Sequence, residues 1–275
     1  MAPNPQGCVD RAVPVLRVDN VEGRLRAVVF GYACHPVTLN GNNLKISGDY
    51  VSFAQRHVEQ QRPGVQAMFL AGCGANANSH PRGGKEQEQW VRKHGESLGT
   101  ETCRVLAGRL RPLHGPLRAE LAWTGLPLEH EYSLEQLREL AARAPSVWHR
   151  RNAQAQLQRR EQGQPLPEFY RAPIALWQFG NDLSLVGLPG EAVAEYVGLI
   201  QKALGSEGLW VAAYCGESFG YLPTAEILRE GGHESMCLTL DSGIFSPDVE
   251  QSVVAAVRAL AAQAGRPGGP ARERR

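Results

Sequence analysis

The chain has 275 residues, of which 43% are hydrophobic and 21% are charged, and its formal net charge is +1. This length and composition are typical of one large globular domain or two small ones, with enough apolar residues to bury a proper core. The near-zero charge speaks against a nucleic-acid binder, and no apolar run approaches the ~20 residues of a membrane span. The N-terminus lacks the charged start and apolar middle of a signal peptide, so the sequence as written predicts a cytoplasmic protein.

The first part of the chain alternates strand and helix signals. Residues 13–33 predict two strands around the turn DNVEG. An amphipathic helix is expected over 48–64, where Pro63 and Gly64 end it. Residues 65–72 predict a short buried strand, which opens into a glycine- and asparagine-rich loop, and residues 86–110 predict a long helix.

The rest of the chain continues this alternation. A helix is expected to start at Ser133, because Gln136 three residues later completes a capping box. Further helices are predicted over 146–168, 192–204 and 246–263, and strands over 117–132 and 172–191 (a hairpin). Residues 208–223 predict another strand followed by a glycine-rich loop. Such alternation indicates an α/β fold with a mixed β-sheet covered by helices. We expect one domain over 1–264 and a disordered tail over 265–275.

Polar side chains follow four of the predicted strands, where open α/β sheets bind their ligands. They are His35; Asn76, Asn78, Ser79 and His80; Glu191; and Tyr221, with His233 further on. Histidine and carboxylate together suit a zinc ion, and a tyrosine oxygen can join them. Simpler interpretations stay open: His35 as a loop cap, Glu191 as negative charge at the start of the 192–204 helix, and Tyr221 as a packed turn residue.

The remaining histidines and the cysteines are expected to be structural or solvated. No C-x-x-C pair occurs, which argues against a thiolate zinc knuckle. Three cysteines, Cys34, Cys73 and Cys215, lie in or beside apolar runs and are interpreted as small buried hydrophobic residues. The histidines in this group are His57, His94, His114, His130 and His149.

Four sequence blocks, in this order, resemble the neutral/alkaline non-lysosomal ceramidase family, and most closely its bacterial ceramidase-like branch. They are AVVFGYACHPVTL with ISGDYVSFAQRHVE, then AMFLAGCGANANSHPRG, LSLVGLPGEAV and GYLPTAEILREGGHE. The resemblance runs from about Val15 to His233. It implies a ceramidase-like catalytic domain, of which this chain is a fragment.

The resemblance also implies a chemistry. The family holds a zinc ion (Zn²⁺) through two histidines, a glutamate and a tyrosine, and three of these positions correspond to His35, Glu191 and Tyr221. Metal-activated water then cleaves an amide (N-acyl) bond such as that of ceramide. The candidate catalytic residues are Asn76, Asn78, Ser79 and His233: Asn78 occupies the place of the family's serine, and His233 that of a tyrosine which stabilises the oxyanion.

The family's first zinc histidine belongs to a His-x-His segment, which this sequence lacks. We therefore expect the chain to be the C-terminal part of a longer catalytic domain, with a separate N-terminal half or a second copy as a partner, and an exported form if an upstream segment carries a signal. The substrate is expected to be a lipid or small-molecule amide. One alternative is a truncated, inactive relative that binds a partner. A metal-free serine hydrolase using Ser79 is disfavoured because no G-x-S-x-G motif occurs.

Overall fold

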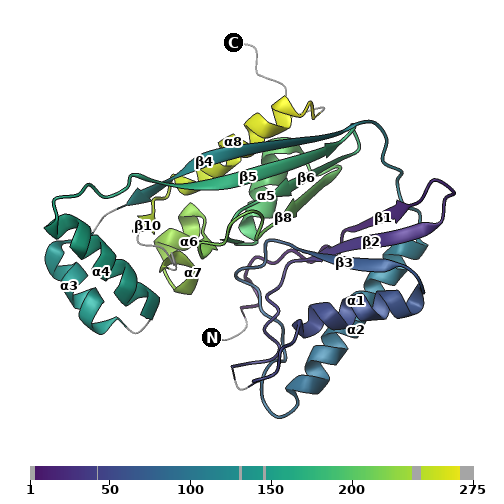
Figure 1. The fold of residues 1–275 in the computed structure, drawn as a ribbon, viewed down its shortest axis with the longest axis horizontal. Helices are drawn as coiled ribbons and strands as arrows, with labels where there is room; N and C mark the ends of the chain where they lie inside the picture. The colour runs from purple at the N-terminus through teal and green to yellow at the C-terminus, as the bar shows by residue number, and fades with distance from the viewer. Residues whose placement is uncertain (1–3, 42, 130–131, 145–146, 237–242, 267–275) are drawn as a thin grey trace. The chain divides into compact units, whose positions relative to one another are not determined.

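The computed structural model describes residues 4–41, 43–129, 132–144, 147–236 and 243–266. Nearly all of the predicted disordered tail, from 267 onward, lies outside these residues, as does His130. The chain divides into two compact units, Met1–Pro112 and Leu113–Arg275 (Figure 1). That residues 1–264 act together as one catalytic domain stays a prediction.

The first unit is built on a mixed sheet with strand order β1-β2-β3. Strand β1 (Val15–Asp19) runs antiparallel to β2 (Leu25–Tyr32), as the predicted hairpin requires. Strand β3 (Gln66–Ala71) runs parallel to β2, with Ala27 opposite Gln66 and Tyr32 opposite Ala71. The two parallel strands therefore end at the same edge of the sheet, which is the arrangement that gathers loop residues in α/β folds.

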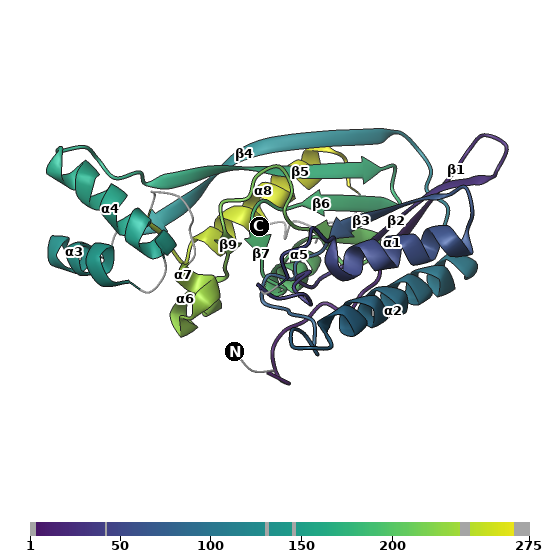
Figure 2. The same cartoon turned by 60° about the horizontal axis from the view of Figure 1, so that its bottom comes forward.

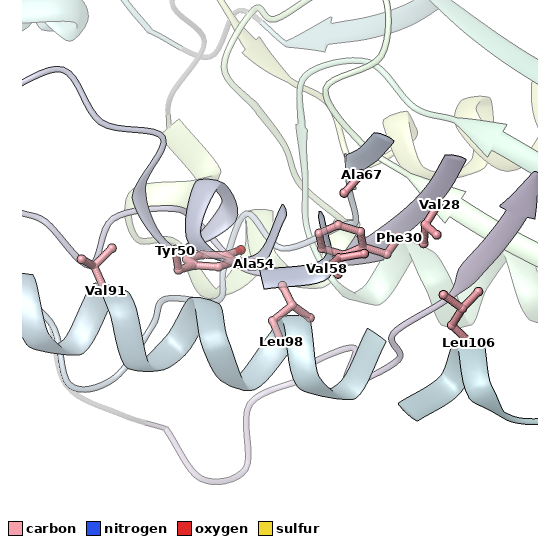
Figure 3. Packing of buried hydrophobic residues seen from close by; sticks show 9 residues of the cluster. All are labelled: Val28, Phe30, Tyr50, Ala54, Val58, Ala67, Val91, Leu98 and Leu106. Carbon is pink, nitrogen blue, oxygen red and sulfur yellow. The ribbon is translucent and has the colours of Figure 1, made fainter. Parts of the chain in front are cut away.

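Two long helices pack against this sheet and against each other, α1 (Asp49–Gln61) and α2 (Gln87–Ala107) (Figure 2). Between them and the strands lies one buried apolar cluster (Figure 3). Phe30 of β2 is fully buried in it, and its ring meets Phe69 edge to face at 5.5 Å between centroids. The cluster consists of Val28, Phe30, Tyr50, Ala54, Val58, Ala67, Val91, Leu98 and Leu106.

The second unit is built on a five-stranded sheet with order β10-β4-β5-β6-β8. Strands β4, β5 and β6 are antiparallel neighbours, whereas β6 and β8 run parallel. The predicted hairpin is therefore confirmed as β5 and β6. The strand bounds are Leu117–Glu129 for β4, Phe169–Phe179 for β5, Leu183–Gly187 for β6, Leu209–Ala212 for β8 and Ile244–Phe245 for β10.

The helices of this unit fall into three groups. Helix α8 (Val249–Gln263) packs on β4 and β5, and α5 (Glu195–Leu204) packs on α8 and β8. Helices α3 (Leu134–Arg143) and α4 (Val147–Glu161) pack on each other between β4 and β5 in the chain. The capping box is confirmed, because Ser133 Oγ accepts from Gln136 N at 3.2 Å and Gln136 Oε1 from Ser133 N at 2.8 Å. Short helices α6 (Ala225–Glu230) and α7 (His233–Met236) follow β8.

The prediction of a helix directly after Glu191 is wrong. Glu191 and Ala192 form a short strand, β7, which pairs in parallel with β9 (Tyr221–Leu222), and α5 begins only at Glu195. The backbone amide of Glu191 donates to the Gly220 carbonyl at 2.8 Å, so this pairing takes the hydrogen bond that a helix start would leave open. Negative charge at a helix N-terminus is therefore not the role of Glu191.

The fold class is confirmed as mixed α/β, with helices covering mixed sheets. Within the described ranges, no helix combines the length and the apolarity needed to cross a membrane.

Glycine sets the distance between α1 and α2. A Cβ added at Gly95 would lie 2.3 Å from Phe53 Cβ and 2.6 Å from the Tyr50 carbonyl oxygen. We expect Gly95→Ala to lower the free energy of unfolding by ~1–3 kcal/mol, because the helices must move apart. Gly198→Ala in α5 is the matched control: nothing lies within 4 Å of its added Cβ, so it should stabilise by ~0.5–1 kcal/mol. Chemical denaturation of both variants measures this, and equal effects would contradict the close approach.

Candidate functional site

His35 lies in the loop just beyond the end of β2. Its backbone amide donates to the Ala77 carbonyl at 2.9 Å, and His35 forms an isolated parallel bridge with Asn78. The loops that follow β2 and β3 are therefore side by side, as their place at one sheet edge predicts. Thus the structure brings His35 together with the loop that carries Asn76, Asn78 and Ser79.

The imidazole of His35 is oriented by a backbone carbonyl. Its Nε2 lies 2.8 Å from the Ala75 oxygen. Because a carbonyl only accepts hydrogen bonds, Nε2 must carry a proton, and Nδ1 is the nitrogen with the lone pair in the neutral ring. Metal-binding histidines in proteins are commonly fixed in this way, with one nitrogen donating to a carbonyl and the other facing the metal.

Two residues of α1 hold the segment around His35 from both sides. The hydroxyl of Tyr50 donates to the Cys34 carbonyl at 2.6 Å, and Asp49 Oδ2 accepts from the Leu39 amide at 2.8 Å. Asp49 is buried at 4% exposure and has a backbone φ of 50°. The sequence analysis did not predict the role of either residue. The Ser-Gly-Asp-Tyr stretch at the start of α1 carries no signal that Asp49 is buried.

Close backbone contact brings the glycine-rich loop to His35. A Cβ on Gly74 would lie 2.4 Å from both the Ala33 carbonyl carbon and the Cys34 amide nitrogen. Only glycine allows this approach, because real Cβ contacts are never so short. The sequence therefore needs a glycine at this position for Asn78 to pair with His35.

The loop side chains have defined partners. Arg82 Nη1 donates to Asn78 Oδ1 at 3.0 Å, which makes Nδ2 the donor end of this amide. Ser79 Oγ shares a hydrogen bond of 2.8 Å with the hydroxyl of Thr38, which is fully buried. Asn78 and Ser79 both line a cavity of about 490 Å³ within the first unit, whereas Asn76 is half-buried in the same loop.

Cys34 also borders this cavity, and its environment makes it a poor nucleophile. Burial, together with the nearby Asp49 carboxylate, raises the pKa of its thiol to about 11. The thiol is therefore protonated at neutral pH, and the thiolate is the reactive form. Cys73 is fully buried as expected, whereas Cys34 and Cys215 are only half-buried.

Glu191 and Tyr221 are direct partners in the register of β7 and β9. Along the chain β7 follows β6 and β9 follows β8, and the two short strands form a parallel two-stranded sheet of their own. Side chains at one register position of a strand pair point to the same face, so the carboxylate and the phenol lie on one side. Gly190 permits the contact: its φ is 61°, and a Cβ there would lie 2.8 Å from the Gly220 oxygen.

Two further contacts shape this second group. The rings of Tyr221 and His233 meet edge to face, with centroids 5.2 Å apart and planes inclined at 73°. The loop before β9 is held by Tyr170, whose hydroxyl donates to the carboxylate of Glu217, and by the Gly190 amide, which donates to the Glu217 carbonyl at 2.7 Å. Burial, reinforced by this hydrogen bond, raises the pKa of Tyr170. The sequence reasoning missed Tyr170 and Glu217, which carry no motif.

The predicted site residues thus form two groups. His35, Asn76, Asn78 and Ser79 belong to the first unit, and Glu191, Tyr221 and His233 belong to the second. Across the described residues, no three His, Cys, Asp or Glu side chains gather as a metal site; the predicted ligand set contains only two residues of these types. One imidazole nitrogen, one carboxylate and one phenol oxygen are nevertheless donors that zinc accepts. The ligand set stays a prediction.

No family model and no curated protein sequence matches the chain. Among solved structures, the neutral ceramidase from Pseudomonas aeruginosa superposes with a TM-score of 0.65 at 17% identity, covering 94% of this chain and 48% of that one. A ceramidase complexed with C2 gives 0.67 at 16% identity, covering 96% and 50%. The chain thus spans about half the length of these structures. The ceramidase-like fold expected from the four sequence blocks is confirmed.

Proposed function

We propose that the chain contributes His35, Glu191 and Tyr221 as ligands of a zinc ion in an amidohydrolase with a ceramidase-like fold. The proposal is carried by the register pairing of Glu191 with Tyr221, which places two oxygen donors side by side in a fold shared with two ceramidases. The orientation of the His35 ring supports it, because the Ala75 carbonyl fixes Nε2 as the protonated nitrogen and Nδ1 as the donor.

A zinc ion held by these side chains would supply Lewis acidity and an activated water for attack on an amide carbonyl. The polar groups of the chain then act on the substrate. Asn78 is the first candidate donor for the carbonyl oxygen, because Arg82 binds its Oδ1 and so identifies Nδ2 as the donor end of the amide. His233, whose ring meets that of Tyr221 edge to face, is the second candidate donor for the developing oxyanion. The substrate class is an N-acyl amide, of which ceramide is one example.

One observation favours the alternative, a partner-binding role without catalysis. Three large apolar side chains at alternating positions of β4 are exposed: Leu117 by 59%, Leu121 by 61% and Trp123 by 57%. Alternating residues share one face of a strand, so these side chains form an apolar row. Such rows are typical of surfaces that bind another protein. Turnover by the purified chain distinguishes this role from the amidohydrolase.

Metal removal tests the proposed function. We expect the purified chain to bind one zinc ion, measured by elemental mass spectrometry, and to release amine from N-acyl amides. Dialysis against a chelator should abolish hydrolysis, and added zinc should restore it, because the reaction needs the metal's Lewis acidity. Hydrolysis that survives complete metal removal would contradict the zinc assignment. A zinc-loaded chain that hydrolyses no amide would instead favour the partner-binding alternative.

A further inference from the structure

The cavity beside Asn78 and Ser79 has walls of mixed polarity, to which polar residue types contribute most of the side chains. Of the side chains that line its volume of about 490 Å³, only Val13 and Leu98 are aliphatic. The others include hydroxyl, amide, imidazole and charged groups, and both Asn78 and Ser79 are among them. Sites for hydrocarbon chains are lined mainly by apolar side chains, with few polar groups. The lining therefore suits a polar occupant better than a long acyl chain.

The two oppositely charged side chains of the lining, Arg11 and Glu101, differ in their partners. Glu101 is bound in a bidentate manner by Arg104, whose Nε and Nη2 each lie 2.7 Å from a carboxylate oxygen. Arg11, in contrast, makes no ion pair with any residue that the structure describes. An arginine fork is well matched to a carboxylate, with which it forms two parallel hydrogen bonds.

The two ends of the cavity differ in depth. Tyr50 and Leu98 are buried and Cys34 is half-buried, so these residues form its floor. Arg11 is exposed and therefore lies at the open side. A bound molecule would reach from the candidate catalytic residues Asn78 and Ser79 to the guanidinium within this one unit.

We propose that the cavity binds the acyl part of the amide substrate, and that this acyl part is short and carries a carboxylate that pairs with Arg11. The inference rests on the proposed amidohydrolase function and names its substrate class. Hydrolysis of such an amide breaks the C–N bond, adds the hydroxyl of water to the carbonyl carbon and a proton to the leaving amine. The products are a dicarboxylic acid and an amine.

Binding of matched 4-nitroanilides tests the inference separately from turnover. The first probe is the N-succinyl compound, and the second is its neutral primary-amide analogue, which has the same shape. The third is the N-palmitoyl compound. Titration calorimetry at low salt measures each affinity for the full zinc-loaded chain, for Arg11→Gln and for Arg24→Gln. Arg24 is the matched control, because its side chain is 77% exposed in the β1–β2 turn and does not line the cavity.

We expect the unmodified chain to bind the succinyl probe about tenfold more tightly than its neutral analogue, since a charged hydrogen bond replaces a neutral one. Arg11→Gln should erase this difference, whereas Arg24→Gln should keep it. Equal affinity for the two probes, tightest binding of the palmitoyl probe, or an undiminished difference in Arg11→Gln would overturn the inference. Selective succinyl binding without turnover of any probe would support the inference and count against the amidase itself.

Discussion

Replacement of His35 by alanine is expected to lower kcat/KM for amide hydrolysis at least a hundredfold and to release the bound zinc. Loss of residues that only orient metal ligands already costs roughly 10–100-fold, so loss of a ligand should cost more. The imidazole is held by the Ala75 carbonyl, and its segment by Tyr50 and Asp49. Steady-state kinetics and elemental analysis of the purified variant measure both effects.

The matched control is His114→Ala, because the His114 side chain is 74% exposed and makes a loose contact of 3.4 Å with Asp182. This variant should keep its zinc and its activity. Glu191→Ala should behave like His35→Ala, since both side chains are assigned to the same ion. Stoichiometric zinc in both His35→Ala and Glu191→Ala would rule out the ligand assignment, whatever the activity.

Truncation of Phe30 to alanine is expected to destabilise the first unit by about 3–5 kcal/mol, the usual cost of removing a buried phenylalanine. Phe30 is fully buried in the apolar cluster of the first unit (Figure 3), and its ring also packs on Phe69. A domain of this size has a total stability of roughly 5–15 kcal/mol, so the loss is a large fraction. Hydrogen exchange of the β2 and β3 amides, read by mass spectrometry, measures it.

Phe169→Ala provides the control for this prediction. This substitution also removes a phenylalanine side chain, but Phe169 lies at the start of β5 and is 55% exposed. Its loss should change stability by less than about 0.5 kcal/mol, as is usual for surface substitutions. Similar losses of protection in the two variants would show that the β2–α1–α2 cluster is not the core that stabilises the first unit.

Local signals made much of the fold predictable. The DNVEG turn between apolar runs gave the β1–β2 hairpin, and the capping box at Ser133 gave the start of α3. These features depend on residues within one or two turns of each other, so the local sequence determines them. The order of strands and helices also placed His35 and Asn78 at the same sheet edge, as the structure shows.

Features that depend on contacts distant in sequence were not predictable. The pairing of Glu191 with Tyr221 is only two residues long in each strand, too short to show any periodicity. Asp49 fixes the segment after His35 by accepting a hydrogen bond from the amide of Leu39, ten residues earlier. The contact of Gly74 with Ala33 depends on the parallel pairing of β2 and β3. In each case tertiary structure, and not propensity, decides the role of the residue.

The most direct test of the account is a crystal structure of the zinc-loaded chain with anomalous data at the zinc edge. The account predicts one strong anomalous peak, with His35 Nδ1, a Glu191 carboxylate oxygen and the Tyr221 hydroxyl each about 2 Å from the metal. A zinc ion bound by other residues, or one that lacks any of these three ligands, would contradict it.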